Sequence, residues 1–332
     1  MKVEPVRMGV ISGADIAWRR TVPAMLASRN VELLAVASRD AGKAERFARR
    51  FGCDPVVGYD GLLERDDVEA VYIPLPTGLR RQWVERSLAA GKHVLAEKPL
   101  ATGHAEAEAL VEAAETLGLT LAENLTFTAH SQHATVHRLL AEGAVGELRA
   151  FTSDFGIPPR AVEDFRARPE LGGGALLEVG VYPIRAAQLF LGPELEVRGA
   201  SLTHDRPGGV DVGGAALFAS AEGLTAQIGF GFRHSYRSVY TLWGEKGTLT
   251  VNRAFTPPDT LRPVVRIERQ DHVEEITLDA DGQFVNALDA FAQAVREGKG
   301  GGLGAESMLA QARLVDGIRA FASMESPLPR NP

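Results

Sequence analysis

Met8-Gly9-Val10-Ile11 is an apolar run that leads into Ser12-Gly13-Ala14-Asp15-Ile16-Ala17, a turn of mostly small residues. The run predicts a buried strand, and residues 14–28 predict a helix that begins at the turn. Such a turn is where a G-x-G-x-x-G/A fingerprint holds a dinucleotide pyrophosphate at a helix N-terminus. Ser12 and Ala14 take the first two glycine positions, so the motif by itself leaves an ordinary βα turn open. The strand–helix context favours nucleotide binding.

The alternation of strand and helix continues to about residue 125. Further apolar runs lie at 33–37, 56–57, 68–75, 93–96 and 120–124, and helical stretches lie at 41–51, 79–90 and 105–117. These runs are continuous, as expected of strands that are buried on both faces. The pattern predicts an α/β domain with a doubly wound parallel sheet, and we assign residues 1–122 to this Rossmann-type domain.

The pattern changes from residue 123 onward. Helices are predicted near 132–141, 175–190, 284–296 and 305–322, and alternating runs separated by Gly, Pro and Asp turns fill 196–278. Alternation of this kind predicts a largely antiparallel, open sheet. We therefore expect residues 123–332 to form one α+β domain that binds substrate and mediates oligomerisation. The glycine-rich stretch 298–302 is expected to be a flexible loop between the last two helices.

Composition limits the classes of function. The 332 residues carry 36 Lys and Arg against 43 Asp and Glu, a net charge of −7, whereas nucleic-acid binders usually carry a basic excess. The single cysteine, Cys53, excludes an internal disulfide and fits a reducing, cytoplasmic setting. We find neither a signal peptide nor about 18 uninterrupted apolar residues, so no membrane association is expected.

The residues after the second predicted strand bear on the choice of cofactor. An NAD site usually places an acid there, which accepts a hydrogen bond from the ribose 2′-hydroxyl. Ser38 and Arg39, with Lys43 one turn on, instead offer donors and positive charge that suit the 2′-phosphate of NADP. Asp40 is more simply a helix N-cap, and a solvated role for Arg39 stays open.

Two motifs resemble those of one enzyme superfamily. Glu97-Lys98-Pro99 follows a predicted strand, and Gly172-Gly173-Gly174 leads into Ala175-Leu176-Leu177-Glu178-Val179-Gly180-Val181-Tyr182-Pro183. They resemble, at the expected spacing, the signatures of the glucose–fructose oxidoreductase / inositol dehydrogenase (Gfo/Idh/MocA) superfamily. The resemblance covers essentially the whole chain. It implies a Rossmann domain followed by an open-faced sheet domain that typically mediates homodimers or homotetramers.

A narrower resemblance points to the NDP-sugar 3-ketoreductases. It rests on 15–20, 72–76, 180–185, 255–258 and 269–272. Those enzymes use NADPH to reduce the C3 keto group of a dTDP-3,4-diketo-2,6-dideoxyhexose. They act after a sugar 2,3-dehydratase, in deoxysugar pathways of antibiotic-producing bacteria. This chain departs from the pattern where Thr77 and Arg80 replace Asn and His, and where Glu178 replaces Asp.

Ketone reduction needs a positioned acid and positive charge near the developing alkoxide. Lys98, at the carboxyl edge of the predicted sheet, and Tyr182, at the family's His/Tyr position, are the catalytic candidates. Which of them gives up the proton first stays open. Glu97 is expected either to orient Lys98 or to bind the cofactor, and a plain ion pair is the alternative.

The resemblance also implies the remaining site residues. The expected cofactor contacts are Ser12, Gly13, Ala14, Asp15, Ile16, Ala17, Ser38, Arg39, Lys43, Tyr59, Leu75, Arg80, Glu97, Arg166 and Glu178. The expected substrate contacts are Arg20, Tyr236 and Thr256, and Arg160, Arg166 and Arg237 are further candidates for the sugar-nucleotide pyrophosphate. For each substrate contact, ordinary surface placement stays open.

Besides the 3-ketoreductase function, the sequence raises a metal site and two other functions. His130, His133 and His137 would share a helix face, but no Cys or acidic ligand accompanies them, so we expect no metal. A second possible function is a dehydrogenase of free sugars, inositols or dihydrodiols. A third is a non-catalytic NADP-sensing regulator, which the presence of Lys98 and Tyr182 disfavours.

Overall fold

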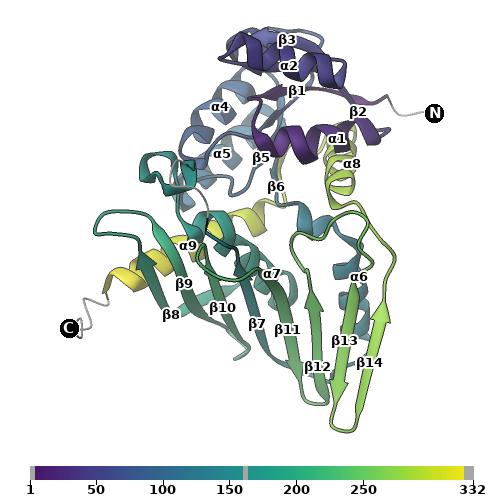
Figure 1. The fold of residues 1–332 in the computed structure, drawn as a ribbon, viewed down its shortest axis with the longest axis vertical. Coiled ribbons are helices and arrows are strands. Elements are labelled where there is room, and N and C mark those ends of the chain that lie inside the picture. The colour runs from purple at the N-terminus through teal and green to yellow at the C-terminus, as the bar shows by residue number, and fades with distance from the viewer. Residues whose placement is uncertain (1–3, 160–163, 325–332) are drawn as a thin grey trace. The chain divides into compact units, whose positions relative to one another are not determined.

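The computed structural model describes residues 4–159 and 164–324, which form two compact units (Figure 1). Unit 1 spans the residues up to Ala129 together with Gly282–Met308. Unit 2 spans His130–Asp281 together with the residues from Leu309 onward. The sequence analysis expected a single boundary at residue 122. The structure differs, because the chain leaves unit 1 after residue 129 and returns to it for residues 282–308.

Unit 1 contains a seven-stranded sheet, sheet A, in which every pair of neighbours is parallel. Its order is β15 (Gly301–Leu303), β6 (Thr120–Asn124), β5 (His93–Glu97), β4 (Ala70–Ile73), β1 (Val6–Ile11), β2 (Val31–Ser38) and β3 (Asp54–Val57). This order confirms the predicted doubly wound fold. The carboxyl ends of parallel strands meet at one edge, where such folds bind ligands.

The helices of unit 1 include one that begins at a side-chain cap that the sequence predicts. They are the π-helix η1 (Ala17–Thr21), α1 (Val22–Ala27), α2 (Ala41–Phe51), α3 (Asp60–Leu63), α4 (Thr77–Ala89), α5 (His104–Leu117), the 3₁₀ helix η2 (Thr126–Ala129) and α8 (Gln283–Arg296). Asp40 caps α2, as predicted, by accepting from the Lys43 N–H at 2.8 Å. Figure 1 shows α8 beside α1; its Leu288, Phe291 and Val295 enter the core that β1 lines.

The glycine-rich stretch 298–302 is predicted to be a flexible loop, and this prediction is wrong for its last two residues. Gly301–Leu303 form strand β15, which pairs with β6 at the edge of sheet A. The Gly301 N–H donates to the Leu119 carbonyl at 2.9 Å, and a Cβ on Gly300 would lie 2.9 Å from the backbone of Gly118. Glycine therefore serves close backbone approach here.

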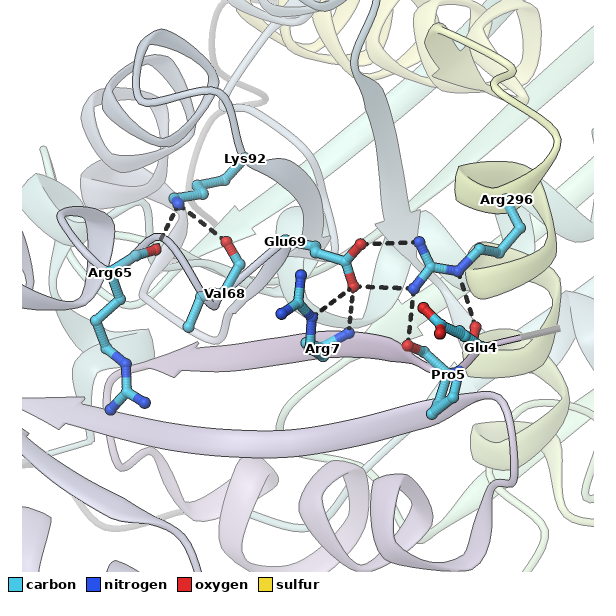
Figure 2. Close-up of polar contacts among 8 residues, drawn as sticks. All are labelled: Glu4, Pro5, Arg7, Arg65, Val68, Glu69, Lys92 and Arg296. Carbon is cyan, nitrogen blue, oxygen red and sulfur yellow. Dashed lines mark hydrogen bonds and ion pairs between the residues drawn. The ribbon is translucent and has the colours of Figure 1, made fainter.

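A cluster of ion pairs holds α8 to the strands of unit 1 (Figure 2). Arg296 donates to both carboxylate oxygens of Glu69 at 2.9 Å and to the carbonyls of Glu4 and Pro5 at 2.8 and 2.7 Å. Arg7 donates to the same carboxylate. These bonds, above all those from Arg296, lower the pKa of Glu69 from 4.5 to about 2 although its partial burial opposes the shift.

Unit 2 is built on an eight-stranded sheet, sheet B. Its order is β14 (His272–Thr277), β13 (Val264–Arg269), β12 (Gly247–Asn252), β11 (Arg237–Gly244), β7 (Leu148–Gly156), β10 (Thr225–Gly231), β9 (Asp211–Ser220) and β8 (Leu195–His204). All neighbours are antiparallel except β7 and β10, which confirms the predicted mostly antiparallel sheet. The register of the strands places Trp243, Leu217 and Val273 on one face of sheet B. All three side chains are exposed there, and the exposed fraction of Trp243 is 62%.

Helices cover the other face of sheet B. The helices are α6 (Ser131–Ala141), the 3₁₀ turns η3 (Phe165–Ala167) and η4 (Pro169–Leu171), the π-helix η5 (Leu176–Gly180), α7 (Val181–Leu191) and α9 (Ala305–Met324), of which the residues from Leu309 belong to unit 2. α7 packs on β7 and β10, and Phe151, Phe218 and Tyr240 are fully buried. Within the described ranges, no helix has the length and apolar character needed to cross a membrane.

We expect Arg296→Gln to lower the free energy of unfolding by about 1–2 kcal/mol at neutral pH, because it removes charged hydrogen bonds from Glu69. The pKa of Glu69 is depressed in the folded state, so its contribution is complete above its ordinary pKa of 4.5 and is lost as the pH falls toward about 2. Urea unfolding at about pH 7 and about pH 3 should therefore show a smaller difference between variant and wild type in acid.

Arg81→Gln is the matched control, since Arg81 pairs with Glu85 at 2.8 Å on an exposed helix face. We expect no measurable change in stability for that variant. A loss for Arg296→Gln that is the same at both pH values would contradict the role assigned to Glu69.

Candidate active site

The turn after β1 is tightly packed. Ser12 has a φ of +94°, which glycine adopts more readily, and its N–H donates to the Ala37 carbonyl at 3.0 Å. A Cβ on Gly13 would lie 3.1 Å from the Lys43 side chain and the Phe47 ring. Ala14 and Ile16 are half-buried, Asp15 is exposed and ion-pairs with Arg19, and Ala17 is buried where η1 begins. Small residues and a helix N-terminus are what a pyrophosphate site requires.

Cationic side chains lie at the end of β2. Ser38 is buried, and its hydroxyl accepts from the Asp40 N–H at 3.2 Å. Arg39 is exposed and makes no hydrogen bond or ion pair with any residue that the structure describes. The Lys43 stem covers Gly13, so its ammonium lies near the same turn. These residues fit a phosphate on the ribose.

A buried polar network holds the end of β5. Glu97 Oε1 accepts from Tyr72 Oη at 2.7 Å and from Asn124 Nδ2 at 2.8 Å, while Oε2 accepts from the Lys98 N–H at 3.3 Å. Tyr72 accepts in turn from Thr21 Oγ1 at 3.0 Å. Burial, and then the negative charge of Glu97, raise the pKa of Tyr72 well above its ordinary value, so the phenol stays a donor.

Arg80 joins two loops at the same edge of sheet A. It is 2% exposed, and its guanidinium donates to the Leu75 carbonyl at 2.7 Å and to the Pro99 carbonyl. These bonds join the Leu75 carbonyl to the loop that carries Lys98, which is half-buried. The Lys98–Pro99 peptide in this loop is cis. Tyr59 is nearly buried and packs edge-to-face on Trp83 at 4.8 Å.

In unit 2, the glycine loop brings Arg166 and Glu178 together. Arg166 Nε donates to Glu178 Oε2 at 2.9 Å, and Nη1 donates to Asp164 at 3.0 Å. A Cβ on Gly173 would collide with the Arg166 carbonyl, and Gly174 has a φ of +119° against Asp211. Asp211 Oδ2 accepts from the Leu176 N–H at 2.6 Å and so holds the start of η5.

Tyr182, Tyr236 and Thr256, which the sequence analysis selected separately, lie in one aromatic cluster of unit 2. The Tyr182 ring contacts Phe155 at 4.9 Å and Phe255 at 5.7 Å between centroids. Phe155 also contacts Tyr236, at 6.4 Å, and Tyr236 Oη lies 2.7 Å from Thr256 Oγ1. Tyr182 is half-buried, while Tyr236 and Thr256 are exposed.

The other predicted arginines have different surroundings. Arg20 is exposed and lines a surface groove of about 500 Å³ with Trp18 and Arg50 in unit 1. Arg237 Nε is paired with Asp154 Oδ2 at 2.9 Å. Arg160 lies outside the described residues.

His133 of α6 and its N-cap His130 are buried, whereas His137 is exposed. Burial lowers the pKa of His133 to about 3, and its Nδ1 lies 3.0 Å from Tyr240 Oη. Among the described residues, no group of three His, Cys, Asp or Glu side chains is arranged to hold a metal ion.

Sequence reasoning missed several residues that shape these sites. Tyr72 lies in a stretch that carries the family resemblance, but the sequence assigns its side chain no role, and Asn124 and Thr21 carry no motif. Arg253 lies in a turn after β12, yet its guanidinium carbon is 4.5 Å from the centre of the Tyr236 ring. A polar residue within a buried strand is the signal that would have singled out Tyr72.

The parallel sheet, the small-residue turn and the second, antiparallel sheet define a two-domain protein of the dinucleotide-binding class. The model of the oxidoreductase family with an NAD-binding Rossmann fold matches residues 6–125, and the GFO/IDH/MocA C-terminal domain matches residues 133–250. The chain therefore belongs to the GFO/IDH/MocA oxidoreductase family.

Individual relatives match over nearly the whole chain. A dTDP-3,4-didehydro-2,6-dideoxy-alpha-D-glucose 3-reductase from Actinomadura kijaniata is 52% identical and covers 96% of each chain. Its namesake from Saccharopolyspora spinosa is 50% identical and covers 95% of this chain and 97% of its own. The solved structure of KijD10, a 3-ketoreductase from Actinomadura kijaniata in complex with NADP and TDP-benzene, superimposes with a TM-score of 0.93 at 52% identity, covering 96% of this chain and 98% of its own.

KijD10 has also been solved with single replacements, a tyrosine by phenylalanine in one structure and a lysine by alanine in another. The two replaced positions are separated along that chain by the same number of residues as Lys98 and Tyr182 in this one.

We expect Tyr72→Phe to lower the free energy of unfolding by about 1–3 kcal/mol, because Glu97 loses a buried donor and Thr21 loses its acceptor. Urea unfolding of the variant against wild type measures the loss. The double variant Thr21→Val with Tyr72→Phe is the control, since it leaves no unpaired Thr21 hydroxyl. The double variant should lose less free energy of unfolding than the sum of the losses measured for Thr21→Val and Tyr72→Phe alone. Strictly additive losses would contradict a coupling between the two hydroxyls.

Proposed function

We propose that the protein uses NADPH to reduce the C3 keto group of a dTDP-3,4-diketo-2,6-dideoxyhexose. The observation that carries this proposal is the match, at half of all positions and over nearly the full length, to dTDP-sugar 3-reductases. Lys98 and Tyr182 supply the groups that ketone reduction requires, and they stand at the edge of sheet A and in the aromatic cluster, respectively.

NADPH, when bound, would supply the hydride and leave as NADP⁺. We assign its pyrophosphate to the turn of residues 12–17 and its 2′-phosphate to Ser38, Arg39 and Lys43. The remaining cofactor contacts that we propose are Tyr59, Leu75, Arg80, Glu97, Arg166 and Glu178. Arg80 and Glu97 serve mainly by fixing the backbone around Lys98, because their bonds reach the Pro99 carbonyl and the Lys98 N–H.

The chain's own acids complete the reduction. The Lys98 ammonium places positive charge where the substrate oxygen becomes an alkoxide, and the Tyr182 hydroxyl is a second proton donor. Phe155 and Phe255 pack against the Tyr182 ring and limit its rotation. Arg20, Tyr236 and Thr256 are the proposed substrate contacts.

The cellular setting follows from the same proposal. The substrate class requires a preceding sugar 2,3-dehydratase, and we place both enzymes in the cytoplasm. The exposed face of sheet B that bears Trp243, Leu217 and Val273 is a suitable surface for a homodimer or a homotetramer.

We expect Lys98→Ala and Tyr182→Phe each to lower kcat by about 10²-fold or more, because each removes a proton-delivering group. Loss of NADPH absorbance is followed with a dTDP-4-keto-6-deoxyglucose that a 2,3-dehydratase has just processed. Binding of NADPH, measured by its fluorescence, should be retained in both variants. Lys246→Ala, at the exposed turn between β11 and β12, is the control, and its kcat should equal that of wild type.

Full activity in both catalytic variants would refute the assignment. Wild-type protein that oxidises free sugars or inositol but ignores the dehydratase product would refute the proposed substrate.

We expect Arg39→Asp to lower the ratio of kcat/KM for NADPH over NADH by about 10–100-fold, because it replaces the cation that faces the 2′-phosphate with an anion. Steady-state rates with both cofactors measure the ratio. Arg49→Asp makes the same change of charge on the exposed side of α2 and should leave the ratio unchanged. If the ratio fell equally in both variants, the effect of Arg39 would be that of a nonspecific surface charge, and the assignment would be contradicted.

A further inference from the structure

The arginines of unit 2 near the aromatic cluster differ in what holds them. Arg166 is bonded to Glu178 and Asp164, and Arg237 is paired with Asp154. Arg253 is exposed and makes no ion pair or hydrogen bond with any residue of the described ranges. It is therefore a cation at the cluster whose charge no described carboxylate neutralises.

Arg253 is held by its ring contact. Its guanidinium carbon lies 4.5 Å from the centre of the Tyr236 ring, and Tyr236 is fixed in turn by the 2.7 Å contact with Thr256. Stacking occupies only a flat face of the guanidinium. The N–H groups along its edge stay available, in the planar fork that binds phosphate oxygens in pairs.

The backbone of the loop is also fixed around Arg253. Its φ of +55° is uncommon for a residue other than glycine, asparagine or aspartate. The Ala254 N–H donates to the Ser238 carbonyl at 3.1 Å, and the Phe255 N–H donates to Ser238 Oγ at 3.0 Å. Ser238 itself is buried. A long, charged side chain is thus kept in a left-handed conformation that glycine would adopt at lower cost.

We propose that Arg253 binds the diphosphate of the nucleotide-sugar substrate, with Tyr236 as the platform that orients it. The inference rests on the proposed function and adds to it a diphosphate-binding residue, Arg253, that the sequence analysis did not identify. Phe155 touches both Tyr182 and Tyr236, so the catalytic hydroxyl and the guanidinium belong to one continuous cluster. A sugar whose keto group faces Tyr182 would have its diphosphate carried toward Arg253.

The overall charge gives weight to a local cation. The chain carries a net charge of −7, and a nucleotide diphosphate is itself an anion. A fixed, uncompensated cation favours the anionic ligand locally, against that net charge.

Two substitutions distinguish the effect of the Arg253 guanidinium from the effect of the strained backbone. Arg253→Gly removes the side chain and suits the positive φ, so a loss cannot be attributed to strain. Arg253→Lys keeps the charge but not the stacked, planar fork. Arg262→Gln, which removes an exposed arginine elsewhere in unit 2, is the matched control.

Binding of dTDP is measured by calorimetry with NADPH at saturation, so that the cofactor's own diphosphate site is filled. For Arg253→Gly we expect the Kd of dTDP and the KM of the sugar nucleotide to rise together by about 10–100-fold, with kcat changed less than about twofold and the Kd of NADPH unchanged. Arg253→Lys should recover part of the loss, and Arg262→Gln should match wild type.

Unchanged dTDP affinity in Arg253→Gly would overturn the inference, as would a fall in kcat with KM unchanged. The calorimetry needs no turnover, so it still tests Arg253 if wild type fails to oxidise NADPH with the dehydratase product. That failure would instead contradict the proposed function.

Discussion

Burial of the Glu97 carboxylate governs the arrangement of the edge of sheet A that carries Lys98. A carboxylate that is 9% exposed must receive hydrogen bonds, and Glu97 takes them from Tyr72 on β4 and Asn124 on β6, the two neighbours of its own strand. Asn124 reaches it because β5 and β6 are parallel and place Glu97 opposite Asn124 in the register. Tyr72 reaches it from β4, where it pairs with Leu95, two residues before Glu97 on the same face of the sheet. The backbone that presents Lys98 is thus fixed by the sheet itself, and Arg80 adds a second tie through the Pro99 carbonyl.

In unit 2, aromatic packing rather than ion pairing positions the Tyr182 side chain. The Tyr182 ring is set by edge and tilted contacts with Phe155 and Phe255, which lie at one end of sheet B. Glycine at positions 173 and 174 lets the preceding loop fold back onto Arg166 and Asp211, and the carboxylate of Asp211 holds the helix on which Tyr182 stands.

Much of the fold was predictable because its signal is local. Continuous apolar runs predicted the parallel sheet, alternating runs predicted sheet B, and the turn after β1 and the Asp40 cap follow from residue type. The return of α8 to unit 1 was not predictable, since an amphipathic helix shows that one face is buried but not against which domain. Strand β15 has almost no apolar residues and was taken for a loop. Tyr72 and Arg253 matter through contacts with residues far away in the sequence, which no spacing rule reports.

The central claim is that hydride from NADPH reaches C3 of the nucleotide sugar. The most direct measurement is NMR of the product formed from freshly dehydrated dTDP-sugar and NADPH that carries deuterium at the transferred position of its nicotinamide ring. We predict one deuterium at C3 of the sugar in the wild-type product. Deuterium at another carbon, or a reduced sugar without deuterium, would contradict the account.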